Sequence, residues 1–494
     1  MGRLVVVSNR VADPRKSAAG GLAVAVGQAL EAAGGLWLGW SGKVTEAGAA
    51  PDTADTPLHM HRSGKVQLAT FDLSAADHDR YYLGYSNGVL WPVFHYRLDL
   101  ADFDAAYFEG YRDVNALFAQ KLMPLLKSDD IIWIHDYHLI PLAAQLRALG
   151  CKQRIGFFLH IPLPPPPLLA AIPQHAWLME CFFAYDVVGF QSQEDVQHFA
   201  DYVQQELGAE KLPSLPAGVS LASDSGQGAN QSPQQGTHQG EQQSPHHGAQ
   251  RFHAFNRTVQ AQAFPIGIDV EEFMRLADGK DAHDAYITTR QQYARRRVMI
   301  GIDRLDYSKG IPNRIRAFRA LLNQFPENRD SATLIQIASP SRETVNAYTD
   351  ILRELEGLCG AINGDFGNLD WMPVRYIHRT VARKRLPGLC RAARVGLVTP
   401  LRDGMNLVAK EFIAAQDAAD PGVLVLSRFA GAAEQLKEAL LVNPYDTHGT
   451  AQAIQRALHM PLEERQERHQ KLLARIKAQD VHWWSKSFLR ALQG

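Results

Sequence analysis

Short apolar runs rich in β-branched residues alternate with longer amphipathic stretches along this chain, and this alternation constrains the fold more than any other feature. The runs cover residues 4–7, 131–134, 155–159, 187–190, 298–302, 333–338, 395–399 and 423–426. Strands that are apolar throughout and are joined by helices form parallel sheets covered on both faces. The pattern therefore predicts an α/β protein.

The length of the chain predicts more than one domain. Hydrophobic cores stop growing at about 250–300 residues, and this chain has 494. The strand runs fall into two sets, which the segment 264–269 separates. We expect two doubly wound, Rossmann-like domains that face each other, residues 1–263 and 264–478. The last amphipathic stretch, with Trp483, Trp484 and Phe488, predicts a helix within 479–494 that crosses back to the first domain.

The segment from about 223 to 250 differs from its surroundings. Gly, Gln, Ser, Pro and His replace almost every apolar residue there. A segment of this composition cannot offset its ordering entropy by burial. We expect a disordered surface insertion, and we assign no metal site to its histidines.

Charge and cysteine usage exclude several classes of protein. The 51 Lys and Arg nearly balance the 52 Asp and Glu, so no overall field attracts nucleic acid or an anionic membrane. The four cysteines form no C-x-x-C pair, which fits neither a disulfide framework nor a zinc site. The first apolar run, 4–7, is too short for a signal peptide or a spanning helix. We expect a cytoplasmic protein that binds neither nucleic acid nor membranes.

Polar residues follow the apolar runs, at the edge where parallel sheets bind ligands. These residues include Arg10, Asp136, His160, Arg304, Lys309, Arg342 and Asp403. Any one of them alone fits a helix cap or a surface ion pair. Cations gathered at several strand ends of a nearly neutral protein instead indicate phosphate binding. We predict more than one bound phosphate group.

Glycine-containing loops support the same interpretation. Residues 403–411 read as a loop that turns into a helix, whose free N–H groups can hold a diphosphate. Gly20 and Gly21, after the first run, can approach a ligand closely or simply form a flexible turn. We also expect a group of aromatic residues in the loops of the first domain, where they stack on a sugar or fill the core: Trp37, Trp40, Tyr81, Tyr82 and Trp91.

Two short motifs suggest other enzyme classes, and their context argues against both. Residues 84–88 match the G-x-S-x-G motif of serine hydrolases, but that motif requires a buried strand before it and a helix after it. Asp102 and Asp104 resemble the D-x-D metal site found in one class of glycosyltransferases. No apolar run precedes them, so we interpret them as the start of a helix.

Longer motifs carry a specific family resemblance. They are VSNR at 7–10, WIHDYH at 133–138, FLHIP at 158–162, RLDYSKG at 304–310 and TPLRDGMNLVAKE at 399–411. Together they resemble the trehalose-6-phosphate synthases over nearly the whole chain, apart from the insertion. The resemblance implies the GT-B fold and the retaining transfer of glucose from UDP-glucose to glucose 6-phosphate, with no metal or other cofactor.

The resemblance also implies roles for individual residues. It places the donor in the second domain, with the residues Gly20, Gly21, Arg304, Lys309, Val381, Asp403, Leu407, Val408, Ala409, Lys410 and Glu411. It places the acceptor in the first domain, with Arg10, Trp40, Tyr82, Trp91, Asp136 and Arg342. The residues implied in catalysis are His160, Arg304, Lys309 and Asp403.

Some positions depart from the family pattern and keep alternatives open. Pro165 and Pro167 replace a hydroxyl and an acidic residue, and Val381 replaces an aromatic residue near the donor base. Glycerol 3-phosphate as acceptor, GDP-glucose or ADP-glucose as donor, and a non-catalytic sugar-phosphate-sensing subunit are therefore alternatives. The intact Arg304 and Glu411 argue against the sensing subunit. Self-association into a homo-oligomer is a further expectation from the family.

Overall fold

A computed structural model describes residues 2–11, 26–27, 30, 34–45, 56–213, 248–341 and 346–494. The predicted site residues Gly20, Gly21 and Arg342 lie outside this part of the chain. Nearly all of the predicted insertion, 223–250, also lies outside it.

The first sheet contains the strands of the N-terminal half. In the described residues its order is β3 (His59–Ser63), β4 (Val66–Ser74), β2 (Gly35–Thr45), β1 (Leu4–Arg10), β5 (Ile131–His135), β6 (Arg154–Phe158), β7 (Val187–Phe190), β10 (Arg257–Ala263), β9 (Gln250–Ala254) and β8 (Glu210–Leu212). The strands from β4 to β10 pair in parallel, whereas β3, β9 and β8 are antiparallel additions at the two edges.

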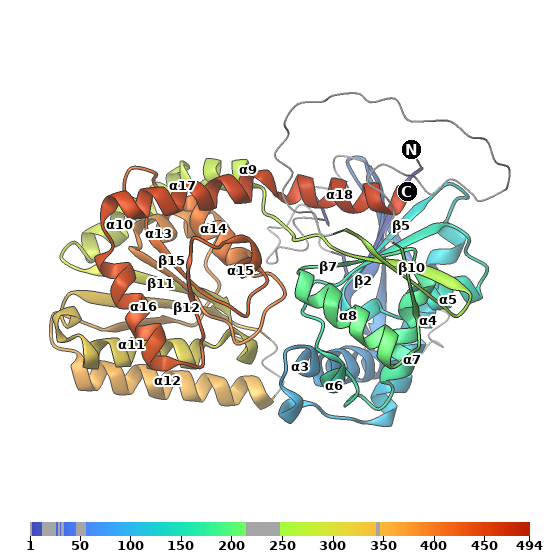
Figure 1. The fold of residues 1–494 in the computed structure, drawn as a ribbon, viewed down its shortest axis with the longest axis horizontal. Helices are drawn as coiled ribbons and strands as arrows, with labels where there is room; N and C mark the ends of the chain where they lie inside the picture. The colour runs from blue at the N-terminus through green and yellow to red at the C-terminus, as the bar shows by residue number, and fades with distance from the viewer. Residues whose placement is uncertain are drawn as a thin grey trace.

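The second sheet contains the strands of the C-terminal half. Its order in the described residues is β13 (Val374–Ile377), β12 (Ala332–Ser339), β11 (Arg297–Arg304), β14 (Val395–Val398), β15 (Val423–Ser427) and β16 (Leu440–Val442), and all of its pairings are parallel. Figure 1 shows the two sheets in separate units that lie side by side. The predicted α/β class and all of the predicted apolar strands are confirmed.

Helices cover the sheets and connect their parallel strands. In the first unit the main ones are π-helix η2 (His78–Leu90), α3 (Trp91–Phe94), α4 (Ala105–Leu122), α5 (Leu142–Ala148), α6 (Pro166–Leu169), α7 (His175–Glu180) and α8 (Gln193–Gln205). In the second unit they are α9 (Val270–Ala277), α10 (Lys280–Gln292), α11 (Ile311–Gln324), α12 (Asn346–Phe366), α13 (Leu386–Ala392), α14 (Leu407–Ala415), α15 (Ala432–Gln435), α16 (Thr447–His459) and α17 (Leu462–Ala478). No helix in the described part of the chain combines the length and apolar character needed to cross a membrane.

The alternation of side chains along β1 divides the interior into two layers. Val5 and Val7 belong to one hydrophobic cluster, and Leu4 and Val6 belong to another on the opposite face. All four side chains are buried, which is the pattern of a strand in the middle of a covered parallel sheet.

The helix α18 (Val481–Gln493) lies against the first sheet, although it follows the second unit in the sequence (Figure 1). The Phe488 ring stacks on Trp133 of β5, with 4.7 Å between the ring centroids. Gly156 and Gly189 make this packing possible, because a Cβ atom at either position would lie 2.8 Å from the Phe488 ring. The predicted return helix is thus confirmed as an element, and it closes one face of the first sheet.

The prediction that the aromatic residues of the first domain lie in loops was wrong. Trp37 and Trp40 lie on β2, Tyr81 and Tyr82 lie on η2, and Trp91 begins α3. The segment that contains β2 carries several glycines, which are poor strand formers, and this composition concealed the strand.

Both rejected motifs lie in helical surroundings. Residues 84–88 lie inside η2, and the Ser86 side chain is fully buried, so no nucleophile elbow forms. Asp104 caps α4 by accepting a hydrogen bond from the Ala106 backbone N–H, which confirms the predicted helix start.

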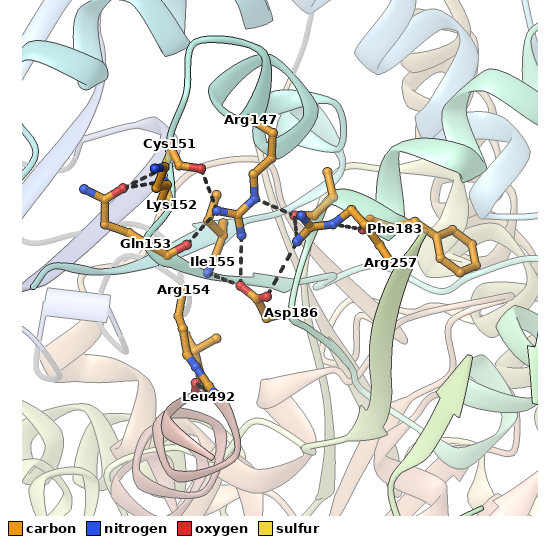
Figure 2. Close-up of polar contacts among 11 residues, drawn as sticks. Arg147, Cys151, Lys152, Gln153, Arg154, Ile155, Phe183, Asp186, Arg257 and Leu492 are labelled. Atoms are coloured by element: carbon orange, nitrogen blue, oxygen red, sulfur yellow. Dashed lines mark hydrogen bonds and ion pairs between the residues drawn. The ribbon is translucent and has the colours of Figure 1, made fainter. Parts of the chain in front are cut away.

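A carboxylate at the start of β7 joins three elements of the first unit. Asp186 accepts a hydrogen bond of 2.7 Å from the Ile155 backbone N–H and one of 3.0 Å from Arg147, and it lies 3.6 Å from Arg257. Figure 2 shows the two guanidinium groups converging on this carboxylate. The carboxylate therefore connects α5, β6 and β10 at the edge away from the strands' carboxyl ends.

Replacing Asp186 by alanine is expected to lower the free energy of unfolding by about 2 kcal/mol, because charged hydrogen bonds are lost and two guanidinium groups are left facing each other. Urea unfolding of the full chain measures this change. The exposed Glu180 provides a matched control, since Glu180→Ala should leave the midpoint nearly unchanged. Equal midpoints for the two variants would contradict the assigned role.

Candidate active site

Strand ends of the two sheets contact each other across the interface between the units. Gly404, after β14, lies so close to the His160 carbonyl that a Cβ atom there would be 2.2 Å from its oxygen. The guanidinium of Arg304, at the end of β11, lies 5.8 Å from the centroid of the Trp91 ring. The predicted ligand-binding edges therefore meet, and each sheet contributes residues to the same region.

Arg10 and Arg304 are exposed in this region. Among the described residues, neither guanidinium takes part in an ion pair or a hydrogen bond. Arg10 lies 5.9 Å from the centroid of the Trp40 ring, and Trp40 lies 5.7 Å from Tyr82. Two cationic groups, one from each sheet, are thus available to anionic ligands.

The loop that connects β14 to α14 is held by a compact polar cluster. Lys309 Nζ lies 2.6 Å from Asp403 Oδ2, and the Asn406 side-chain amide donates to the same oxygen at 3.0 Å. Asn406 has a φ of 72° and its side chain makes no cap on α14. Within the described part of the chain, no side chain accepts a hydrogen bond from the first N–H groups of α14, and helix starts of this kind can bind phosphate.

The residues of α14 differ in what they offer a ligand. Leu407, Val408 and Glu411 are half-buried, and Ala409 is buried. Burial raises the pKa of Glu411 to about 7, while Arg383 opposes this shift and Glu272 adds to it. The half-buried Val381 packs against the same hydrophobic cluster as Leu407 and Val408.

The Lys410 side chain is used inside the protein. Its ammonium donates hydrogen bonds of 2.7 Å to the Ile266 carbonyl and to Gln435 Oε1, and burial lowers its pKa to about 7. These contacts tether the segment between the two units to α14. Because its side chain is occupied, we assign only the backbone of Lys410, and not its ammonium group, to a donor site.

His160 and Asp136 lie next to each other at the ends of β6 and β5. The His160 backbone N–H donates a hydrogen bond of 3.2 Å to Asp136 Oδ1. The ring nitrogen Nε2 of His160 lies 3.1 Å from Nδ1 of His135. Asp136 has a φ of 75°, which is uncommon for a residue with a side chain and is often found at functional sites. Burial lowers the pKa of His160 to about 3.

A buried network beneath the strand ends was not found from the sequence. Arg314 of α11 is 1% exposed, donates to Thr399 Oγ1 and Gln336 Oε1 at 2.9 Å each, and bonds to Asp303. It thereby connects the ends of β11, β12 and β14, from which the site loops start. Its position inside an amphipathic helix gave no signal, because arginine there usually faces solvent.

Contacts between Arg402 and the first unit were not predicted from the sequence either. Arg402 forms an ion pair of 2.7 Å with Glu194 and lies 4.5 Å from the centroid of the Tyr96 ring. Glu434 accepts hydrogen bonds from the Gln193 and Glu194 N–H groups, at 3.0 and 3.3 Å. These contacts hold the two units together beside the strand ends, and local sequence patterns carry no information about such pairs.

Comparison with known proteins places this geometry in a family. The model of glycosyltransferase family 20 matches residues 6–494. The chain belongs to this family. A trehalose-6-phosphate synthase from Enterobacter sp. (strain 638) is 45% identical to this family 20 chain over 495 residues, covering 100% of the chain and 95% of the relative.

Solved structures of other proteins confirm the GT-B fold class of this family 20 chain. An α,α-trehalose-phosphate synthase (UDP-forming) from Burkholderia xenovorans, in complex with glucose-6-phosphate, is 46% identical, covers 100% of both chains and superposes with a TM-score of 0.89. An E. coli protein bound with UDP-2-fluoro glucose is 43% identical, with 100% of this chain and 99% of that chain covered and a TM-score of 0.87. The family resemblance seen in the sequence motifs is therefore confirmed.

Replacing Gly404 by alanine is expected to slow glycosyl transfer by about 100-fold, because a misplacement of about 1 Å at an active site has this effect. The new Cβ would force the His160 backbone and the β14 loop apart. Initial rates and a thermal melt measure the change. Gly357→Ala is the control: this α12 position is open, and the variant should keep full activity. A fully active Gly404→Ala enzyme would contradict the close approach.

Proposed function

We propose that this chain is a retaining glucosyltransferase that makes α,α-trehalose 6-phosphate and UDP from UDP-glucose and glucose 6-phosphate. The observation that carries the proposal is the pair of exposed cations, Arg10 and Arg304, which approach one interface from different sheets. Two phosphorylated substrates account for two separate cationic groups. The glucose-6-phosphate and the UDP-sugar analogue bound by the two solved relatives support the same pair of substrates.

The donor is proposed to lie against the second sheet. Arg304 and Lys309 neutralise its diphosphate, with help from the uncapped start of α14. Glu411 takes the ribose hydroxyls, and Val381 lies near the base. The remaining proposed donor residues are Gly20, Gly21, Asp403, Leu407, Val408, Ala409 and the backbone of Lys410.

The acceptor is proposed to lie against the first sheet. Arg10 and Tyr82 hold its phosphate together with Arg342, and Asp136 binds the sugar. Trp40 and Trp91 form the walls of its pocket. The positions of Arg10, Trp40 and Tyr82 support this assignment, since their rings and guanidinium form one cluster.

The reaction needs no protein nucleophile in this proposal. The anomeric hydroxyl of glucose 6-phosphate attacks C1 of the donor glucose from the face that UDP leaves, so a C1–O bond to the acceptor forms as the bond to the diphosphate breaks. The departing diphosphate takes the hydroxyl proton. Asp403 and His160 orient the transferring glucose, and Arg304 and Lys309 stabilise the negative charge that develops on the diphosphate.

Three further assignments complete the proposal. We place the domain boundaries after residues 263 and 478, which is supported by the end of β10 at Ala263 and by the packing of α18 on the first sheet. A cytoplasmic location and a homo-oligomeric state stay predictions from sequence and family.

Release of UDP from UDP-glucose tests the proposal directly. Purified protein is assayed with and without glucose 6-phosphate, in the presence of a chelator, and the sugar product is identified. Release that depends on glucose 6-phosphate and yields trehalose 6-phosphate supports it. Release only with GDP-glucose, ADP-glucose or glycerol 3-phosphate would replace the donor or acceptor, and binding without any turnover would indicate the sensing subunit.

A further inference from the structure

A second histidine lies directly behind His160. His135, the last residue of β5, is fully buried, and its Nδ1 lies 3.1 Å from Nε2 of His160. Its other ring nitrogen, Nε2, is buried and has no hydrogen-bond partner in the described part of the chain. No role implied by the family motifs involves this residue.

Aromatic rings enclose the two histidines. Trp133 lies 4.5 Å from His135 and Phe158 lies 4.7 Å from His160, measured between ring centroids. Trp484 of α18 lies 6.2 Å from His135 and 6.0 Å from His160. This packing leaves His135 little freedom to rotate.

Both imidazoles are neutral at pH 7. Burial lowers the pKa of His160 to about 3, and burial together with the neighbouring His160 lowers the pKa of His135 well below its ordinary value. A neutral imidazole carries one N–H group and one bare nitrogen. At 3.1 Å the two facing nitrogens form a hydrogen bond with a single proton between them, and the ring that supplies this proton determines the tautomers of both.

The buried Nε2 of His135 decides between the two arrangements. If His160 were the donor, His135 would have to carry its proton on Nε2, where the described residues provide no acceptor. If His135 is the donor, its Nε2 is a bare nitrogen, and a buried acceptor without a partner is tolerated more often than a buried N–H without one. The second arrangement requires His160 to carry its own proton on Nδ1.

We propose that His135 is a positioning residue, which donates from Nδ1 to Nε2 of His160 and so presents the Nδ1–H of His160 to the transferring sugar. The contact with the sugar rests on the proposed function, whereas the hydrogen bond between the rings does not. Partners of this kind orient functional histidines in other proteins by fixing the ring and its tautomer.

Nitrogen NMR of the histidine-labelled full chain at pH 7 tests the hydrogen bond without substrate. His135→Asn assigns the signals of the pair by difference. The expected result is a proton on Nδ1 of both His135 and His160. A proton on Nε2 of His160, or averaged tautomers, would overturn the proposal whatever the enzyme's substrates are.

Kinetics of two His135 variants test the consequence for catalysis. His135→Phe keeps the ring and removes the donor, and it should lower kcat by about 10- to 100-fold, the usual cost of losing such a partner, with the KM for glucose 6-phosphate within about twofold. His135→Asn places an amide donor near the Nδ1 position and should recover most of kcat. A loss of ring packing alone would not be rescued by the smaller asparagine.

His469→Phe is the matched control, because His469 is also buried and bonds to a backbone carbonyl, of Ile413, in the second unit. It should keep parental kcat per folded molecule. A folded His135→Phe enzyme with parental kcat, or a His135→Asn enzyme as slow as His135→Phe, would overturn the positioning role. Absence of transfer by the parent chain would contradict the proposed function instead, and the NMR result would still decide on the hydrogen bond.

Discussion

Replacing Arg304 by alanine is expected to lower kcat by about 1,000-fold, a loss of about 4 kcal/mol in transition-state stabilisation, which is typical for removal of a preorganised charged or hydrogen-bonding group. Arg304 is exposed at the end of β11 and lies over Trp91 of the opposite unit. Its charge would therefore act on the departing diphosphate rather than on a protein carboxylate. Single-turnover rates of UDP release measure the change.

Two variants control this experiment. Arg297 begins the same strand at its other end and is also exposed, so Arg297→Ala should retain parental kcat. Arg304→Lys keeps the charge without the planar fork and should fall between the parent and Arg304→Ala. Turnover by Arg304→Ala close to that of the parent would remove Arg304 from the mechanism.

Replacing Arg314 by methionine is expected to lower the free energy of unfolding by about 3–5 kcal/mol, the usual loss when one partner of a buried ion pair is removed. The Asp303 carboxylate would remain buried without its cation, and Gln336 and Thr399 would each lose a hydrogen bond. Urea unfolding of the full chain measures this effect.

The same helix supplies the matched control for Arg314. Arg316 is half-exposed and pairs with Glu354 on the surface, so Arg316→Met should change the free energy of unfolding by less than about 1 kcal/mol. Adding Asp303→Asn to Arg314→Met should recover part of the loss, because the unpaired charge disappears. Similar unfolding midpoints for Arg314→Met and Arg316→Met would show that the network does not stabilise the fold.

The strands that could be predicted are those whose burial is visible in the neighbouring residues of the sequence. The run 4–7 is apolar throughout because β1 is covered on both faces, and this property is visible in the sequence itself. The strand β2 was missed because glycines interrupt it, and β9 and β10 were missed because polar residues interrupt their apolar pattern.

In the candidate site, too, some residues could be located from neighbouring sequence, whereas others depend on partners far away in the sequence. The positions of Arg10, His160, Arg304 and Asp403 at strand ends could be predicted from the apolar runs before them, and their roles in ligand binding stay predictions. Arg314 and Glu194 act through partners far away in the sequence, Thr399 and Arg402. No spacing rule reports such pairs, so only the folded chain reveals them.

The packing of α18 has a consequence for the order in which the protein is made. A ribosome delivers β5, β6 and β7 early, yet Phe488, which fills the space over Gly156 and Gly189, emerges only after the whole second sheet has been synthesised. The N-terminal unit therefore cannot complete its core as a newly made segment on its own. During translation its sheet keeps an apolar face open to chaperones or to other nascent chains until the C-terminal half has followed.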